Sequence, residues 1–246
     1  MQFSLRRAHA ALSLALLGTP ALGQITGTDP TYSLASGEAI YSYFDISGTL
    51  SQTGGLLRST DGLYVGDIHS GSYNLSGGTV EAGSLVVSRA GTMVQTGGTV
   101  TTGTFHVGLR ENGTSSYRMQ GGSLTAGAFT IGGSPGSNAR VFLHSGTLTA
   151  AYLVKGGTQA GTAEIYFLGG TLRAGGDHIN YLSSNLTTYV SSGGFIFDTN
   201  GFAVDLYNTL LHLDEPTVPI DGGLTKQGAG TLRLGVANHY TGATTL

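Results

Sequence analysis

The sequence contains no cysteine and no tryptophan, and charged residues make up only 10% of its 246 positions. Without cysteine, neither disulfide bonds nor thiolate metal ligands contribute, so the fold depends on packing and hydrogen bonds. The net charge of -3 is weak and predicts no attraction to nucleic acid or to an anionic membrane surface. No apolar run approaches the length of about 20 residues that a membrane-spanning helix needs, so we expect no membrane span in this chain.

Glycine, tyrosine and phenylalanine, in contrast, are abundant. The chain has 42 glycines, 12 tyrosines and 9 phenylalanines, and 39% of it is hydrophobic. Disordered chains usually combine few aromatic residues with a high net charge, whereas this chain has many aromatic residues and a low net charge. The composition therefore predicts a folded protein that turns frequently.

The N-terminus has the organisation of a secretory signal peptide. Arg6 and Arg7 precede a short apolar run over residues 10–17, and small residues lead up to Gly23. This order of a basic segment, an apolar segment and a small-residue cleavage site is typical of export signals. We expect residues 1–23 to be removed and the mature, exported protein to begin at Gln24.

Paired glycines mark an internal repeat. Pairs begin at residues 54, 77, 97, 121, 169 and 193, and Ser145-Gly146 fills the one missing place, so successive spacings are 23, 20, 24, 24, 24 and 24 residues. Such self-similarity at a fixed period predicts a solenoid, in which each repeat is one structural unit.

Apolar residues keep phase with the glycines. Each pair is followed three residues after its start by an aliphatic residue: Leu57, Val80, Val100, Leu124, Leu148, Leu172 and Ile196. Four consecutive units carry an apolar residue at the eighth place: Leu85, Phe105, Phe129 and Leu153. Later in the unit stand alternating pairs: Tyr117/Met119, Val141/Leu143 and Ile165/Phe167. Alternation with period two predicts half-buried strands.

The predicted fold is all-β: a right-handed single-stranded parallel β-helix, or β-solenoid, with coils of roughly 24 residues. We assign residues 24–47 to an N-terminal cap, 48–198 to the glycine-rich repeats and 199–221 to an irregular break. Lys155 stands where Val107 and Ile131 stand in other units. Either the strand slips by one residue there, which turns Tyr152 and Val154 inward, or Lys155 faces outward at a corner.

The last segment, residues 222–246, resembles a known family. It reads Leu-Thr-Lys-Gln-Gly-Ala-Gly-Thr-Leu-Arg-Leu from Leu224, then Ala-Asn-His-Tyr-Thr-Gly from Ala237 to Gly242. These ordered positions resemble the autotransporter-associated β-strand repeat. The resemblance covers about the last tenth of the chain, and the Gly-Gly-Thr-Val/Leu units before it look like the looser repeats that accompany it.

The resemblance implies an exported, surface-associated or secreted bacterial passenger that serves in adhesion or as a stalk. Complete autotransporters continue into a C-terminal translocator in the outer membrane, whereas this sequence stops within a repeat at Leu246. The chain is therefore either a fragment whose C-terminal translocator is missing or a relative exported by another route. Glycans and extracellular protein surfaces are the partners that such a passenger implies.

An enzyme is the main rival, because parallel β-helices also host polysaccharide lyases and glycoside hydrolases, which need clustered carboxylates. In a solenoid, side chains cluster when neighbouring units carry them at the same phase. The acidic residues of the repeats occupy different phases: Asp61, Asp67, Glu81, Glu111, Glu164, Asp177 and Asp198. Asp177 and Asp198 come nearest to alignment, three positions apart, so we predict no catalytic residues.

The histidines are scattered in the same way and show no metal-ligand spacing: His69, His106, His144, His178, His212 and His239. We expect no metal and no cofactor. Tyr32, Tyr41, Tyr43 and Phe44 form the one aromatic cluster before the repeats, for which burial in the cap is the first interpretation and a contact patch the second. The sequence thus favours an adhesive or structural scaffold without chemistry, with a polysaccharide-active enzyme and a ligand-free spacer as alternatives.

Overall fold

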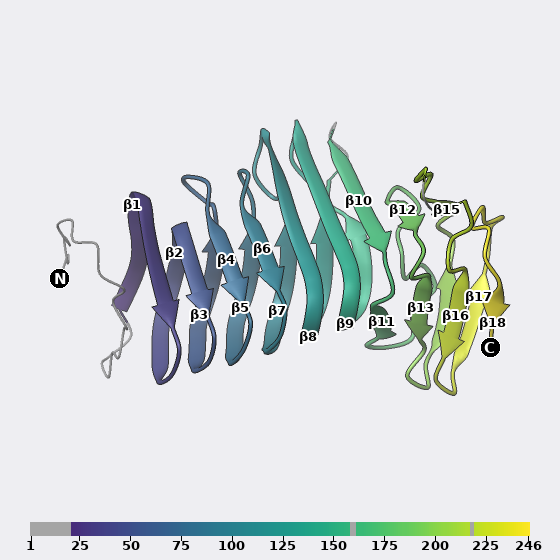
Figure 1. Cartoon of the computed structure of the whole chain (residues 1–246), viewed down its shortest axis with the longest axis horizontal. Helices are drawn as coiled ribbons and strands as arrows, with labels where there is room; N and C mark the ends of the chain where they lie inside the picture. The colour runs from purple at the N-terminus through teal and green to yellow at the C-terminus, as the bar shows by residue number, and fades with distance from the viewer. Residues whose placement is uncertain (1–20, 158–160, 217–218) are drawn as a thin grey trace.

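The protein is a rod of stacked β-strand coils (Figure 1). The computed structural model describes residues 21–157, 161–216 and 219–246. Within these ranges there is no helix, and coils of about 24 residues stack in parallel to form a solenoid of about eight turns. The parallel β-solenoid predicted from the glycine spacing is therefore confirmed. The predicted signal peptide lies outside the described residues as far as residue 20.

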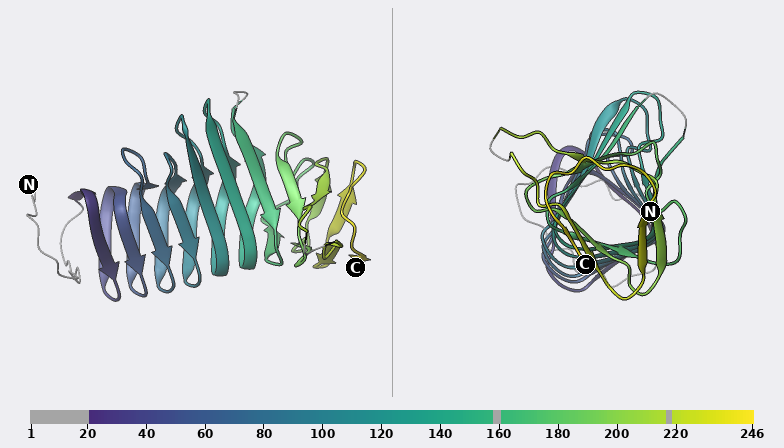
Figure 2. Two further views of the ribbon diagram at one scale, coloured as in Figure 1. Left: turned by 45° about the horizontal axis from the view of Figure 1, so that its top comes forward. Right: turned by 90° about the vertical axis from the view of Figure 1, so that its right-hand side faces the viewer.

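Each coil contributes strands to three faces, which superpose as a ring of ribbon when the rod is viewed along its axis (Figure 2). The first face includes β4 (Ser72–Leu75), β6 (Thr92–Gln95), β10 (Thr162–Phe167), β12 (Thr187–Val190) and β15 (Leu210–His212). The second includes β11 (Thr171–Ala174), β13 (Phe195–Asp198), β16 (Leu224–Gln227) and β18 (Thr244–Thr245), and the third includes β14 (Ala203–Leu206) and β17 (Thr231–Leu234).

The remaining strands are long enough to bend from one face to another. They are β1 (Ala21–Leu34), β2 (Glu38–Gln52), β3 (Leu56–Val65), β5 (Thr79–Val87), β7 (Thr99–Val107), β8 (Gly113–Ile131) and β9 (Ser137–Lys155). Strands β8, β9 and β10 rise above the rest of the rod in Figure 1. All registers between neighbouring coils are parallel, so each residue lies beside its counterpart in the next coil.

The interior is a set of apolar ladders that run along the rod axis. On the third face Leu85, Phe105, Phe129 and Leu153 are successive partners and all are fully buried. The rings of Phe105 and Phe129 stack with centroids 4.7 Å apart. The alternating pairs predicted for the first face, from Tyr117/Met119 to Ile165/Phe167, are buried as well. Because each apolar side chain packs between those of the coils on either side, no coil is stable alone.

Glycine is required where the chain turns from the first face to the second. Gly98 has a φ of +70°, and a Cβ atom there would lie 2.7 Å from the carbonyl oxygen of Gly78 in the coil before. Both the left-handed backbone and the close approach of stacked corners exclude a side chain. Next to this corner the buried side chain of Gln95 donates hydrogen bonds to the carbonyls of Gly98 and Ser123 and accepts one from the Tyr117 hydroxyl.

The regular spacing predicts the wrong buried residue at one corner. The sequence places Ile196 inside, in line with Leu172, but the strand partner of Leu172 is Phe197. Phe197 is fully buried and Ile196 is only half-buried. The chain fits two large rings, Phe195 and Phe197, on the inner face here, and their alternation leaves the intervening isoleucine outside.

Lys155 does not displace the strand. Leu153 stays buried beside Phe129, and Lys155 lies in register with Ile131 at the end of β9. Its ammonium group donates to the carbonyl of Gly161, 2.9 Å away. The alternative with a one-residue slip is therefore wrong, and Lys155 stands at a corner where its charge reaches a polar partner.

The segments assigned to a cap and to a break also contain strands of the stack. Within residues 24–47, β1 and the first part of β2 pair in parallel with the strand that follows each of them. Within residues 199–221, β14 pairs with β17 and β15 pairs with β12. The register of the second face also continues from β13 to β16 across this segment.

Candidate functional site

The outer surface of the rod carries ion pairs between neighbouring coils. In each of four pairs an arginine and a carboxylate occupy facing positions on adjacent strands: Arg58–Glu81 at 2.8 Å, Arg140–Glu164 at 3.0 Å, Arg173–Asp198 at 3.1 Å and Arg233–Asp205 at 2.6 Å. Opposite charges at facing positions favour the register that pairs them. For Arg58–Glu81 and Arg140–Glu164 the sequence signal was the equal phase of opposite charges in successive units, which a search for clustered acids does not detect. Arg173 and Asp198 differ in phase by one position, and they face each other only because the strand register shifts there.

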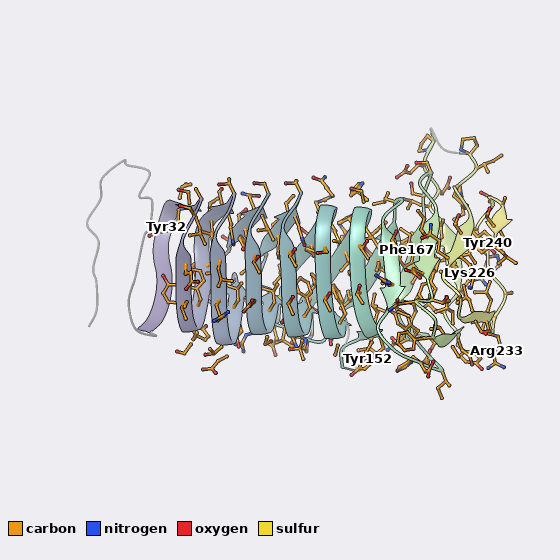
Figure 3. All side chains as sticks on the ribbon, turned by 90° about the horizontal axis from the view of Figure 1, so that it is seen from below. Tyr32, Tyr152, Phe167, Lys226, Arg233 and Tyr240 are labelled. Carbon is orange, nitrogen blue, oxygen red and sulfur yellow. The ribbon has the colours of Figure 1, made fainter. Side chains whose placement is uncertain are left out.

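The two acids that came nearest to alignment in the sequence, Asp177 and Asp198, have different partners. Asp198 pairs with Arg173, whereas Asp177 accepts the backbone N–H of Ala203 at 2.7 Å. Asp177 instead shares a shallow, open depression with Asp205, and the depression is also lined by His178, Ile179 and Ala203. Tyr152 packs its ring on His178 with centroids 5.1 Å apart, and it lies on the outside of the rod, as does Arg233 (Figure 3).

The other acids considered in the sequence are dispersed. Asp61 and Glu111 are exposed, and Asp67 binds Arg110 at 2.7 Å and the Tyr43 hydroxyl at 3.0 Å. Within the described residues no group of three or more histidine, aspartate or glutamate side chains could hold a metal ion. Among the same residues, no helix is long and apolar enough to cross a membrane.

The aromatic cluster at the N-terminal end is divided between the inside and the outside. Phe44 is buried and stacks on Tyr41 with centroids 4.5 Å apart, while Tyr32 and Tyr41 pack against the core. Tyr43 lies on the outer side, where its ring packs beside that of Tyr64 with the ring centroids 4.8 Å apart. Burial and the hydrogen bond to Asp67 raise the pKa of Tyr43 well above its usual range, so its hydroxyl stays protonated.

A longer aromatic array, which the sequence reasoning missed, lies on the outer side of the first face. Arg118, Phe142, Tyr166 and Tyr189 are facing residues on four successive coils, and we call them the aromatic strip. The Phe142 and Tyr166 centroids are 4.7 Å apart with planes at 13°, and those of Tyr166 and Tyr189 are 5.0 Å apart at 22°. The Arg118 guanidinium lies 4.0 Å from the Phe142 centroid. Each member is half-buried.

The surroundings of the strip are polar. Tyr166 donates a hydrogen bond of 2.8 Å to Glu164, which also pairs with Arg140. Burial and the contact with Glu164 raise the pKa of Tyr166 to about 12. Burial and the charge of Arg118 lower the pKa of His144, so this imidazole is neutral at pH 7. Arg118 forms no ion pair within the described part of the chain, which leaves this end of the strip positive.

A buried carboxylate joins the last repeat to the coil before it. Asp221 is 4% exposed and accepts backbone N–H groups from Gly223, Thr241 and Gly242, each within 2.9 Å. His212 Nδ1 lies 2.8 Å from the same carboxylate. Burial by itself raises the pKa of Asp221, but these hydrogen bonds outweigh it and hold the pKa below its ordinary value.

The comparison with protein-family models also identifies the C-terminal segment as a repeat. Residues 224–246 match the model described as passenger-associated-transport-repeat. No curated protein and no solved structure matches the chain. The matched residues form β16, β17, β18 and their connections, and Asp221 binds their Thr241 and Gly242. The chain therefore carries a passenger-associated transport repeat as the last part of a parallel β-solenoid, which fits an exported autotransporter passenger repeat protein.

Proposed function

We propose that the protein is an exported scaffold that adheres to extracellular surfaces through its long outer faces and performs no chemistry. The observation that carries the proposal is the combination of a stack of parallel β-strand coils with a passenger-associated transport repeat. A rod of parallel strands presents outer side chains in straight rows, so many weak contacts can form at once and add up to firm attachment.

The state of the carboxylates supports a role without chemistry. Asp198, Asp205 and Glu164 each form an ion pair with an arginine, and Asp177 accepts a hydrogen bond from a backbone N–H. A glycoside hydrolase or lyase needs carboxyl groups that are free to exchange protons with a bound sugar. The depression beside Asp177 and Asp205 brings two carboxylates to one open surface, and we therefore test it for such an activity.

Export is tested with the full chain, tagged at its C-terminus, in a Gram-negative host. We expect a product outside the cytoplasm whose N-terminus begins near Gln24, as measured by cell fractionation and mass spectrometry. A control with Arg6→Glu and Arg7→Glu should stay inside, because export signals need a basic N-terminal segment. An uncleaved chain that remains in the cytoplasm would refute export by this signal.

Adhesion and chemistry are separated by two assays on the purified exported protein. Beads coated with the protein should be retained on surfaces that carry glycans or matrix proteins, and retention should fall when free protein competes. No retention on any surface would favour a ligand-free spacer. Release of sugar ends or unsaturated products from polysaccharides, abolished by Asp177→Asn, would identify an enzyme and overturn the proposal.

A further inference from the structure

The rings of the aromatic strip form an offset stack along the rod. Their centroids are 4.7 and 5.0 Å apart, and the planes are nearly parallel. Carbon atoms in contact lie about 3.5–4.0 Å apart, so these separations require the rings to be offset. An offset stack leaves part of each ring uncovered, which agrees with the partial burial of all three aromatic residues. The strip therefore presents apolar ring surface in a straight row, with one ring per coil.

The strip ends in an arginine whose charge is available for a ligand. Arg118 contacts the face of Phe142 and forms no ion pair within the described residues. The nearest acid row is already satisfied, because Glu164 binds both Arg140 and Tyr166. The region around the strip is thus positive on a protein whose net charge is -3. A negatively charged ligand complements this region better than a neutral or cationic ligand does.

The shape of the surface favours a linear ligand. Rows of facing residues recur at the spacing of parallel strands, about 4.8 Å, which is close to the length of one pyranose unit in an extended chain. Polar side chains flank the rings, among them the neighbouring row of Ser116, Arg140, Glu164 and Thr187. Tight protein partners usually bury an anchor side chain in a pocket, and the strip lines neither the depression beside Glu81 nor the one beside Asp177.

We propose that the aromatic strip binds an extended acidic polysaccharide, with sugar rings packed against the exposed parts of Tyr166 and Tyr189 and a uronate carboxylate bound by Arg118 where it covers Phe142. A guanidinium matches a carboxylate through two parallel hydrogen bonds. The Tyr189 hydroxyl has no hydrogen-bond partner in the described part of the chain and remains available to a sugar hydroxyl. This inference rests on the proposed adhesive function and names its ligand class.

The test is titration of the purified exported protein with polygalacturonate and alginate oligosaccharides, with neutral oligosaccharides of equal length in parallel. Binding should prefer the acidic sugars and weaken with added salt, because the ion pair is exposed to solvent. Arg118→Gln and Tyr189→Ala should each weaken binding roughly tenfold. Tyr207→Ala is the matched control, because Tyr207 is an exposed tyrosine outside the strip, and it should bind as the native protein does.

The outcomes separate this inference from the function on which it rests. Circular dichroism and thermal melting must first show that each variant is folded. If Tyr189→Ala does not fold, Arg118→Gln remains as the test variant, because it leaves every aromatic ring in place. Equal binding of neutral and acidic sugars, or binding unaffected by both variants, overturns the inference. Beads that adhere to matrix proteins without any glycan binding refute the strip as a glycan site but leave the adhesive scaffold standing. A dimer that Tyr189→Ala dissociates would make the strip a self-association surface.

Discussion

Among single residues, packing decides which side chain of a corner lies inside. Phe197 is buried between Phe195 and Tyr181, with ring centroids 5.7 and 5.3 Å away, while its neighbour Ile196 faces outward. Two adjacent apolar residues on one strand therefore have very different importance for stability. This difference gives a direct test of the register that the structure assigns to β13.

We expect Phe197→Ala to lower the free energy of unfolding by about 3–5 kcal/mol, because it removes a large ring from a filled interior. Ile196→Ala, at the preceding position of the same strand, should cost under about 1 kcal/mol. Urea unfolding followed by circular dichroism measures both. A larger loss for Ile196→Ala than for Phe197→Ala would show that β13 has the register predicted from the glycine spacing, and equal losses would contradict the difference in burial between the two residues.

Asp221 is the residue whose ionisation the fold uses most directly. Its pKa is held below the ordinary value of 3.8 by the hydrogen bonds of the last repeat. A carboxyl group whose pKa is lower in the folded than in the unfolded protein stabilises the fold above its unfolded pKa. That stabilisation is lost as the pH falls from the unfolded value through the lower folded value.

Replacement of the charged carboxylate by Asp221→Asn should therefore cost about 1–3 kcal/mol at neutral pH, since one of the two acceptor oxygens becomes an amide NH2 group that faces N–H donors. The difference from the native protein should shrink as the pH falls below about 4. Unfolding by urea at several pH values measures the trend. Asp214→Asn, at an exposed position outside this network, is the control, and a difference that stays constant with pH would contradict the role of the charge.

Among structural elements, the corner between the first and second faces sets how closely coils approach. The glycine pairs are placed where backbone stacks directly on backbone, as Gly98 does on Gly77 and Gly78. Gly176 is a useful contrast, because a Cβ atom there meets nothing within 4 Å. The same residue type thus occupies both constrained and unconstrained turns.

Gly98→Ala should destabilise the protein by about 1–3 kcal/mol, because alanine must adopt a left-handed backbone and collides with the Gly78 carbonyl. Gly176→Ala should be neutral or slightly stabilising, since it restricts only the unfolded chain. Thermal melting of both variants beside the native protein provides the comparison. A similar loss for both would mean that the corner at Gly98 relaxes easily and does not fix the coil spacing.

Across the whole molecule, stability should depend on position along the rod. A central coil such as the one containing β7 is hydrogen-bonded to coils on both sides, whereas β17 and β18 each pair with one strand only. In a stack whose units contact only their neighbours, opening begins where fewest neighbours hold a coil.

Hydrogen exchange measured by mass spectrometry should therefore show the slowest amides in the coils of β5, β7 and β8 and faster exchange in β17 and β18. We expect exchange rates to rise stepwise from the centre towards the C-terminal end, since each lost coil uncovers the next. Uniform protection along the rod would instead indicate that the solenoid opens only as a single unit.

The sequence by itself determined the architecture, because the 24-residue spacing and the apolar phase depend on local turn geometry and on period-two strands. It also determined the terminal repeat, whose ordered residues from Leu224 to Gly242 are recognisable without coordinates. Only the tertiary structure decided which of Ile196 and Phe197 is buried, how Lys155 is accommodated, and that strands continue through residues 199–216. The aromatic strip likewise required the structure, since outward residues become neighbours only when the coils stack. Ring size, corner geometry and contacts between coils act over distances that a spacing along the chain does not encode.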